Sequence, residues 1–416
     1  MKIFEMPGDK SISHRAIILG SISEGKTIIE NCLISEDVLR TVDCFKALGV
    51  DIKIKGSTVI IIGNGLKGLR PPKTPLYCGN SGTTVRLISG VLVAQNFCSE
   101  VEGDFSLNKR PMDRIILPLR LMGGNIKGRK DKFPPLEIEP TNKLKGIDYR
   151  LPVASAQVKS ALILGAVYGE GATIITEKAP SRDHTERMIK YFDGNIKKIN
   201  NKIIVKPVSK LNGKKVYVPG DISSAAYFIV GALILEGTGL LIKNVGINET
   251  RIGFIQVLKK MGGSIDIVNF RSYNNEPMAD IYVEHSKLKG IEIKGNIIGK
   301  LIDEIPILAV AATMAEGKTI IKDAKELKYK ETNRIDAMVN ELRKMGSDIK
   351  KLEDGMIIEG RGMLKGGKLK SYNDHRIVMA LSIAGLCAKD KIYFDSTECV
   401  KISFPNFFNE LSRFLD

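Results

Sequence analysis

Cationic and hydroxyl side chains gather where the sequence predicts the start of its first helix. The segment Met6–Arg15 ends a strand with Pro-Gly and then presents Lys10, Ser11 and Arg15. Either Ser11 or Ser13 is a suitable cap for this helix. The free amides and the dipole at a helix N-terminus attract anions, so the segment is a candidate site for a phosphate or a carboxylate. The alternative is an ordinary surface helix start with incidental charges.

A glycine-rich turn at Gly79–Arg86 offers the same chemistry. It opens an apolar, helix-like stretch, with Gly82 allowing close approach of a ligand and Thr83 offering a hydroxyl donor. A tight turn with a threonine cap is the alternative. Further along, Arg110 precedes Pro111, which restricts the backbone. Arg110 is therefore a candidate for a fixed anion clamp rather than a mobile surface side chain.

Two more predicted helix starts carry polar donors. They lie at Ser155–Ser160 and at Ser181–Glu186. Serine and aspartate are common helix caps, so each of these segments taken alone is better explained as a cap than as a site.

Carboxylates stand beside cations in the second half of the chain. Two carboxylates beginning at Asp303 precede an apolar helix, and Asn373–Arg376 opens another. Between them, Lys330 and Arg334 have the spacing of one helix face, with Glu331 beside them. Neighbouring cations control the pKa and the geometry of a carboxylate, so the pattern is typical of a general acid or base working among anions. A solvated ion pair at helical spacing is the alternative.

The stretch Gly20–Thr27 matches the phosphate-loop pattern of nucleotide-binding proteins. A working phosphate loop leaves a strand and opens a helix. Here the pattern follows a helix-like stretch and precedes the strand Thr27–Glu30, and the similar copy at Glu316 has Ala312 in place of the first glycine. The order of the elements therefore argues against an ATP or GTP site.

Internal repeats organise the elements that must position these groups. The hexapeptide Glu-Gly-Lys-Thr-Ile-Ile occurs at Glu24–Ile29 and Glu316–Ile321, with weaker copies at Glu170–Ile175 and Glu236–Ile242. Each copy follows a run of small apolar residues, which predicts a helix, a glycine turn and a strand. The copies stand about 70 residues apart or at a multiple of that distance.

Two further apolar stretches, Thr84–Ala94 and Ile377–Ala388, complete a set of six predicted αβ units. A second signal alternates with the first and predicts a helix that ends at a glycine before a strand. It occurs at Leu48–Ile52, Met122–Ile126, Phe192–Ile196, Met261–Ile265 and Met345–Ile349.

The chain is predicted to form two domains of three repeats each. Pro7–Asp9 reads Pro-Gly-Asp, and the same tripeptide recurs at Pro219–Asp221, where we place the start of the second half. Residues 10–218 would form the first domain, and residues 1–9 with 219–416 the second. The hinge would lie near Pro7–Lys10 and Pro219–Asp221.

The composition restricts the class of protein. Apolar residues make up 43% of the chain, and no apolar run reaches the roughly 18 residues of a membrane span. The N-terminus lacks a signal-peptide pattern, so we expect a cytoplasmic protein. The six cysteines show neither a Cys-x-x-Cys pair nor a histidine at zinc-ligand spacing, which predicts free thiols and neither metal nor cofactor.

The formal charge of +16 suits nucleic acid, an acidic membrane or anionic small substrates. No groove-reading motif or basic stripe with interleaved aromatic residues accompanies it. We therefore expect small anionic substrates, and neither nucleic acid nor membrane, as partners.

Taken together, the motifs resemble those of the enolpyruvyl transferase family, and most closely its branch that acts on shikimate 3-phosphate. The similarity covers nearly the whole chain in order, at Asp9–Arg15, Gly79–Arg86, Lys109–Met112, Ser155–Gln157, Pro219–Ser224, Asp303–Pro306, Lys330–Met338 and Asp374–Met379. The resemblance implies an α/β fold of two inside-out barrel domains, each of three βαβαββ-type repeats, that close on the substrates. We also expect a monomer.

The resemblance assigns roles to individual residues. For shikimate 3-phosphate it implies contacts from Lys10, Ser11, Arg15, Ser155, Ala156, Gln157, Arg182, Asp303 and Lys330. For phosphoenolpyruvate it implies contacts from Lys10, Gly82, Thr83, Arg110, Gln157, Lys330, Arg334 and Arg376. The catalytic proton carriers would be Asp303, Glu331 and Lys10. The implied reaction adds the shikimate 5-hydroxyl to phosphoenolpyruvate and then eliminates phosphate.

The chain departs from the family pattern in two places. Ala156 stands where many members have a serine, and Ile402 stands where some members have a lysine. Lys401 is offset by one position and in a strand would face the other way, so we leave it outside the site.

Three alternatives remain open from the sequence. The first is the sister branch that acts on UDP-N-acetylglucosamine, whose members usually show Lys-Asn where this chain has Lys10-Ser11. The second is a nucleic-acid-binding repeat protein that uses the high positive charge. The third is a phosphate-loop nucleotidase.

Overall fold

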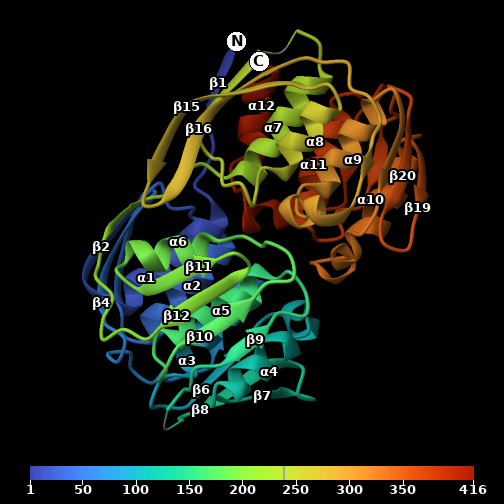
Figure 1. Cartoon of the computed structure of the whole chain (residues 1–416). Helices are drawn as coiled ribbons and strands as arrows, with labels where there is room; N and C mark the ends of the chain where they lie inside the picture. Colours follow the sequence, from blue (N-terminus) through green and yellow to red (C-terminus); the bar gives the residue numbers. More distant parts are fainter. Residues whose placement is uncertain (142, 238) are drawn as a thin grey trace. The chain divides into compact units, whose positions relative to one another are not determined.

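The computed structural model describes residues 1–141, 143–237 and 239–416; Thr238, in one of the weaker hexapeptide copies, lies outside them. Within the described residues the chain divides into two compact units (Figure 1). The fold is mixed α/β in both units, as the sequence predicts.

The two units exchange short pieces of chain. The N-terminal unit comprises Gly8–Val218 and Tyr273–Glu276, and the C-terminal unit comprises Met1–Pro7, Pro219–Ser272 and Pro277–Asp416. The sequence assigns residues 1–9 to the second half, whereas Gly8 and Asp9 lie in the N-terminal unit because Asp9 caps its first helix. The sequence also gave no sign that the segment beginning at Tyr273 belongs to the N-terminal unit.

The described part of the N-terminal unit has three four-stranded sheets, each with two associated helices. In spatial order the strands of the first sheet are β13 (Lys215–Tyr217), β2 (Glu24–Glu30), β4 (Thr58–Asn64) and β3 (Asp51–Lys55). Those of the second are β5 (Leu76–Tyr77), β6 (Ser99–Glu102), β8 (Phe133–Glu139) and β7 (Asn125–Arg129). Those of the third are β9 (Asp148–Arg150), β10 (Thr173–Thr176), β12 (Lys202–Lys206) and β11 (Asn195–Ile199). The helices are α1 (Lys10–Ile22), α2 (Glu36–Ala47), α3 (Gly82–Leu92), α4 (Asp113–Leu121), α5 (Ala156–Ala166) and α6 (His184–Tyr191).

The C-terminal unit repeats this plan with one change. Its four-stranded sheets are β1 (Lys2–Glu5), β14 (Gly239–Gly246), β16 (Glu276–Glu284), β15 (Ser264–Tyr273), and β17 (Glu292–Ile293), β18 (Gly317–Ile321), β20 (Met356–Gly360), β19 (Asp348–Lys351). A two-stranded sheet pairs β21 (Gly367–Leu369) with β22 (Ile392–Phe394). The helices are α7 (Ile222–Ile234), α8 (Gly253–Lys260), α9 (Ile305–Met314), α10 (Arg334–Lys344), α11 (His375–Gly385) and α12 (Phe407–Leu415).

The four-stranded sheets share one topology. In spatial order, one edge strand runs parallel to its neighbour, that neighbour pairs antiparallel with the next strand, and this strand pairs antiparallel with the other edge strand. In four of the described sheets the parallel edge strand comes first in the chain, which gives the predicted βαβαββ order, whereas in the first sheet it is β13, which comes last. The sixth repeat is incomplete, because a 3-10 helix at Glu398–Ile402 and α12 follow β22 in place of the second helix and hairpin. The described strands form separate, open sheets, and none of these sheets closes on itself.

Strands from distant parts of the chain complete the first sheet of each unit. β13, just before the crossing at residue 218, pairs with β2, and β1, at the start of the chain, pairs with β14. In the second case Lys2 lies opposite Leu240. Each of these sheets therefore takes its parallel edge strand from a part of the chain on the far side of the whole N-terminal unit's helices and sheets in sequence.

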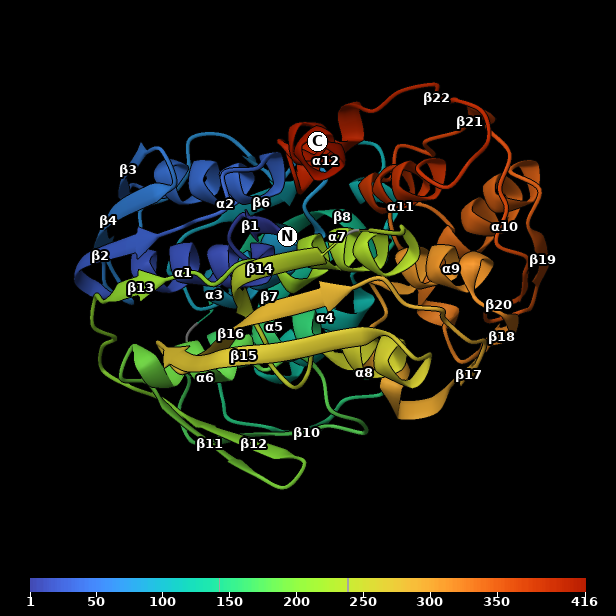
Figure 2. The same cartoon turned by 90° about the horizontal axis from the view of Figure 1, so that it is seen from above.

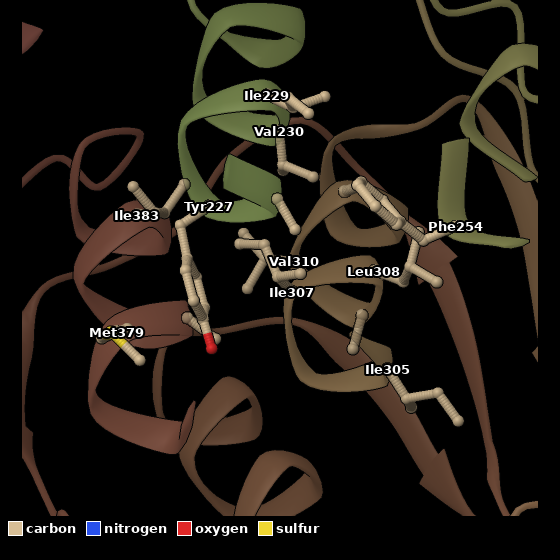
Figure 3. Close-up of a cluster of buried hydrophobic side chains, with 14 of the residues drawn as sticks. Tyr227, Ile229, Val230, Phe254, Ile305, Ile307, Leu308, Val310, Met379 and Ile383 are labelled. Atoms are coloured by element: carbon tan, nitrogen blue, oxygen red, sulfur yellow. The ribbon is translucent and has the colours of Figure 1, made fainter. Parts of the chain in front are cut away.

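The first helix of each repeat is buried on nearly all sides, which makes these helices the core of the unit. In the C-terminal unit, α7, α9 and α11 lie between the sheet of β14–β16 and the sheet of β18–β20 (Figures 1 and 2). Figure 3 shows how Val230 of α7, Val310 of α9 and Ile383 of α11 pack together. The runs of small and branched apolar residues in the sequence form these buried helices.

The glycine of each hexapeptide copy lies after a buried helix, at or within two residues of the start of the next strand. Gly25, Gly171, Gly237 and Gly317 have φ angles of 87°, 81°, 74° and 82°. A Cβ atom at any of them would meet nothing within 4 Å, so the left-handed backbone, rather than lack of space, requires glycine. The predicted order of helix, turn and strand is confirmed at all four copies.

Candidate functional site

The buried helices of the N-terminal unit begin with side-chain caps. Asp9 accepts a hydrogen bond from the Ile12 amide at 2.9 Å and so caps α1. The prediction of Ser11 or Ser13 as the cap is wrong, because the chain reaches helical geometry one residue after Asp9. Ser81 caps α3 and Ser155 caps α5. The amides of these first turns remain the natural place for an anion.

A chain of hydrogen bonds joins the starts of α3 and α5. Arg86 donates from Nη1 to the carbonyl oxygen of Gly82 at 3.0 Å and to Oε1 of Gln157 at 2.9 Å. Gln157 in turn donates from Nε2 to Oγ1 of Thr83 at 3.0 Å. The structure therefore brings Gly82, Thr83 and Gln157 together, as the predicted site requires.

The sequence reasoning assigned no role to Arg86, although it closes the glycine-rich motif. Its position four residues after Gly82 places its side chain over the first turn of the helix, and that spacing is a signal that could have identified it.

Arg110 is held against the same glycine turn. Its Nη2 donates to Oδ1 of Asn80 at 2.6 Å and to Oγ of Ser106 at 3.3 Å. A Cβ atom at Gly82 would lie 2.6 Å from Nη1 of Arg86 and 3.4 Å from Nη1 of Arg110. Glycine at this position thus lets two guanidinium groups approach the start of α3, which agrees with a fixed anion clamp.

Lys10 and Arg15 extend this set from α1. Lys10 is half-buried and forms an ion pair with Asp37 of α2 at 3.0 Å. Arg15 is buried and donates to Thr185 at 2.6 Å, to Ser160 at 2.9 Å and to the carbonyl of Ser11 at 2.8 Å. Burial lowers the pKa of Arg15 to about 10. Arg15 therefore ties α1 to α5 and α6.

The remaining predicted residues of this unit lie on or beside the same helix starts. Ser11 is in the first turn of α1, Ala156 is the first residue of α5, and Arg182 is half-buried in the turn just before α6. All three therefore lie at helix starts of the N-terminal unit.

The C-terminal unit gathers three cations around one carboxylate. Asp303 precedes α9, and its Oδ1 lies 3.1 Å from Nζ of Lys330 and 3.4 Å from Nη1 of Arg334. Its Oδ2 lies 3.8 Å from Nη2 of Arg376, at the start of α11. Lys330 and Arg334 do not share a helix face, contrary to the spacing argument, because α10 begins only at Arg334. They meet through Asp303 instead.

Arg334 connects the carboxylates of this group. It is 1% exposed, and its guanidinium donates to Asp374 at 2.8 Å, to Asp303 and to Glu331. Burial alone would lower the pKa of Arg334, but Asp374, Glu331 and Asp303 hold it above its usual value. The same holds for the pKa of Arg376, where Asp303 opposes the effect of burial. Both arginines are therefore permanent cations.

Asp374 belongs to this group of charges, although the sequence reasoning assigned it no role. It caps α11 by accepting a hydrogen bond from the Arg376 amide at 2.9 Å and also fixes Arg334. Its position before a helix was visible in the sequence, but its partner 40 residues away was not.

Lys401, left outside the site, is exposed and pairs with Glu398 in a 3-10 helix rather than a strand. In the described ranges, no group of three or more His, Cys, Asp or Glu side chains is arranged to hold a metal ion. No described helix is both long and apolar enough to cross a membrane. The Gly20–Thr27 stretch runs from α1 into β2, which is the reverse of a phosphate loop.

The two sets of groups have complementary chemistry. The N-terminal unit offers amides, hydroxyls and cations, which bind anions. The C-terminal unit offers cations together with Asp303 and Glu331, two carboxylates that share Arg334. Carboxylates held by fixed cations can transfer protons while the cations bind phosphate or carboxylate groups.

Comparisons with known proteins agree with this chemistry. The family model for EPSP synthase (3-phosphoshikimate 1-carboxyvinyltransferase) matches residues 2–411. The 3-phosphoshikimate 1-carboxyvinyltransferase of Thermoanaerobacter sp. (strain X514) is 53% identical over 406 residues, covering 98% of this chain and 96% of the relative. That of Petrotoga mobilis is also 53% identical, covering 97% and 94%.

A solved structure of EPSP synthase from Acinetobacter baumannii superimposes with a TM-score of 0.89 at 46% identity, covering 99% of this chain and 95% of the other. The family model, the curated relatives and the solved structure each span nearly the full length. The chain therefore belongs to the EPSP synthase (3-phosphoshikimate 1-carboxyvinyltransferase) family.

Proposed function

We propose that this protein transfers the enolpyruvyl group of phosphoenolpyruvate to the 5-hydroxyl of shikimate 3-phosphate and releases inorganic phosphate. The relatives at about half identity are named for this reaction, which belongs to aromatic amino acid biosynthesis. The observation that carries the proposal is the group around Asp303. Three cations contact this one carboxylate, and a second carboxylate, Glu331, shares one of them.

The proposed reaction is an addition followed by an elimination. The methylene carbon of phosphoenolpyruvate takes a proton while the 5-hydroxyl gives up its own proton to a base and its oxygen attacks the adjacent carbon, which gives a tetrahedral ketal. The ketal then loses a proton from its methyl group and expels phosphate, which restores the double bond. Asp303, Glu331 and Lys10 are the proposed proton carriers, because each is a titratable group held by a charged partner.

The remaining groups bind and orient the two substrates. We assign phosphoenolpyruvate to Gly82, Thr83, Arg110, Gln157, Lys330, Arg334 and Arg376, together with Lys10. We assign shikimate 3-phosphate to Ser11, Arg15, Ser155, Ala156, Gln157 and Arg182, with contributions from Lys10, Asp303 and Lys330. Fixed cations and helix amides compensate the negative charge of both substrates, so positioning and charge compensation would supply much of the rate.

Phosphate release tests the proposal directly. The protein is mixed with phosphoenolpyruvate and, in separate reactions, shikimate 3-phosphate or UDP-N-acetylglucosamine. We expect phosphate release in the reaction with shikimate 3-phosphate and none in the reaction with UDP-N-acetylglucosamine. Release only with the sugar nucleotide would keep the chemistry and overturn the acceptor, and no release with either would overturn the proposed function.

We further propose that the protein works as a monomer in the cytoplasm without a nucleic-acid partner. Each described set of site groups lies within one unit of a single chain, so no second copy is needed to supply them. Light scattering at assay concentration would test the monomer, and retention on DNA that falls steeply with salt would contradict the absence of a nucleic-acid partner.

A further inference from the structure

A buried ion cluster lies within the N-terminal unit, beside the residues that are proposed to bind shikimate 3-phosphate. Lys159 of α5 is fully buried, and its Nζ lies 2.9 Å from Oε1 of Glu177 and 2.7 Å from Oε1 of Glu186. Glu177 follows β10, and Glu186 lies in α6. The cluster therefore connects α5, the end of β10 and α6.

The cluster also binds the segment that leads into α6. Oε1 of Glu177 accepts hydrogen bonds from the amide of Ser181 at 3.1 Å and from its hydroxyl at 2.5 Å. Nζ of Lys159 donates to the carbonyl of Ser181 at 3.3 Å. The amide, the hydroxyl and the carbonyl of Ser181 are thus all hydrogen-bonded to the cluster. Arg182 is the next residue in the chain, so the same bonds restrain its backbone.

Stability alone does not explain this arrangement. Burial would lower the pKa of Lys159, but Glu186 and Glu177 hold it above its usual value, while burial raises the pKa of Glu186. Well-packed apolar residues often stabilise a core as much as a buried ion pair does. A buried pair does, however, fix geometry, because each charge must keep its partner.

The geometry that the cluster fixes belongs to the proposed substrate site. Lys159 is one turn along α5 from Ser155 and two residues from Gln157. Ser160, its neighbour in α5, bonds Thr185 of α6 at 2.6 Å and accepts from Arg15 at 2.9 Å. Movement of Ser181 would therefore change the position of Arg182 relative to the start of α5.

We propose that the Lys159–Glu177 pair is a positioning device that holds Arg182 at a fixed place just before α6, and so sets the affinity for the phosphate of shikimate 3-phosphate. This inference rests on the proposed function. It concerns binding of one substrate rather than the chemical step. Neither Lys159 nor Glu177 is expected to touch substrate, because both are fully or almost fully buried.

The test is a comparison of Glu177→Ala with Glu177→Gln. Alanine removes the bonds to Ser181 but leaves Lys159 paired with Glu186, so the core keeps a balanced pair. We expect a rise of about tenfold in KM for shikimate 3-phosphate, with kcat and the KM for phosphoenolpyruvate within about twofold of wild type. Glutamine keeps an acceptor oxygen for Ser181 and should recover most of the loss.

A double-mutant cycle separates positioning from general damage. If Glu177 acts through Arg182, then Glu177→Ala should have little further effect on KM in an Arg182→Ala background. Glu170→Ala is the control, since Glu170 lies shortly before β10 and, among the described residues, its carboxylate forms an exposed ion pair with Lys143 at 2.6 Å. If Glu177→Ala does not fold, Ser181→Ala, which deletes only the hydroxyl bond, should shift KM in the same direction by a smaller factor.

The outcomes distinguish this inference from the proposed function. Wild-type protein that fails to turn over shikimate 3-phosphate overturns the function. If wild-type protein does turn over shikimate 3-phosphate, three results overturn the positioning role. The first is an unchanged KM for shikimate 3-phosphate in Glu177→Ala and Ser181→Ala, and the second is an equal rise in the KM values for shikimate 3-phosphate and phosphoenolpyruvate. The third is additive effects of Glu177→Ala and Arg182→Ala in the double-mutant cycle.

Discussion

Replacing Asp303 with asparagine should lower turnover and tighten phosphoenolpyruvate binding at the same time. The Asp303 carboxylate lies 3.1 Å from Lys330, 3.4 Å from Arg334 and 3.8 Å from Arg376. Asparagine has nearly the same shape but cannot carry a proton. Loss of a general acid or base lowers kcat by about 10²–10⁴-fold, and we expect a fall in this range.

The effect on binding follows from the same distances. The three cations around Asp303 are also the proposed clamp on phosphoenolpyruvate, so Asp303 repels the anion that they attract. Two unit charges about 4 Å apart repel by about 1 kcal/mol in bulk water and by about 4 kcal/mol at an effective dielectric of about 20. Even the lower figure predicts a fall of about fivefold in the KM for phosphoenolpyruvate.

Steady-state phosphate release measures both effects when phosphoenolpyruvate is varied at saturating shikimate 3-phosphate. Calorimetric titration with shikimate 3-phosphate should give an affinity near that of wild type, because asparagine keeps an acceptor oxygen in place of the Asp303 carboxylate. Asp280→Asn is the matched control, because Asp280 is a buried carboxylate in the same unit that pairs with Arg271 at 2.5 Å, away from these cations. A raised KM for phosphoenolpyruvate, or a loss of kcat below about tenfold, would refute the reasoning.

Three further predictions follow from the described contacts. Glu331→Gln should lower kcat by at least about 10²-fold and leave the calorimetric affinity for shikimate 3-phosphate near wild type; a fall below about tenfold removes Glu331 from the chemistry. Arg334→Met should destabilise the protein to chemical denaturation by about 3–5 kcal/mol, because it leaves the buried Asp374 without its cation. Adding Asp374→Asn should recover part of that loss, and no recovery would contradict the explanation. Burial, helped by Lys10 and Arg15, holds the pKa of His14 well below its usual value, so the unfolded chain takes up the proton first as pH falls. Stability should be full above about pH 6.5 and decrease below it by up to about 1.4 kcal/mol per pH unit, while His14→Gln should flatten this slope in melting experiments.

The repeat pattern of the fold was predictable because it leaves a local signature. A glycine with positive φ must follow each buried helix that turns directly into a strand, and such glycines recur along the sequence. The second signal behaves in the same way, with Gly49 at 85° and Gly262 at 96° after their helices. The sixth repeat carries no copy of the second signal, and it also lacks the second helix and hairpin, since a 3-10 helix and α12 follow β22.

The helix starts that carry the candidate residues were predictable, but their pairings were not. Helix starts can be read locally, and Gly82, Gln157 and Asp303 lie at or just before the starts of α3, α5 and α9, while their proposed roles come from the family resemblance. The convergence of Lys330 and Arg334 on Asp303 spans 27 and 31 residues and depends on how α9, α10 and α11 pack. Lys159 is a harder case, since a lysine within a small-residue helix carries no local sign that two carboxylates will bury it.

The pairing of β1 with β14 means that the first strand leaves the ribosome long before its partner exists. Lys2 can pair only after Leu240 has been synthesised, which takes roughly 10–50 s at a synthesis rate of about 5–20 residues per second. During that time almost all of the N-terminal unit is synthesised and can begin to fold. Residues made before the N-terminal unit therefore join the unit made after it, and the first sheet of the C-terminal unit can form only once β14 has been synthesised.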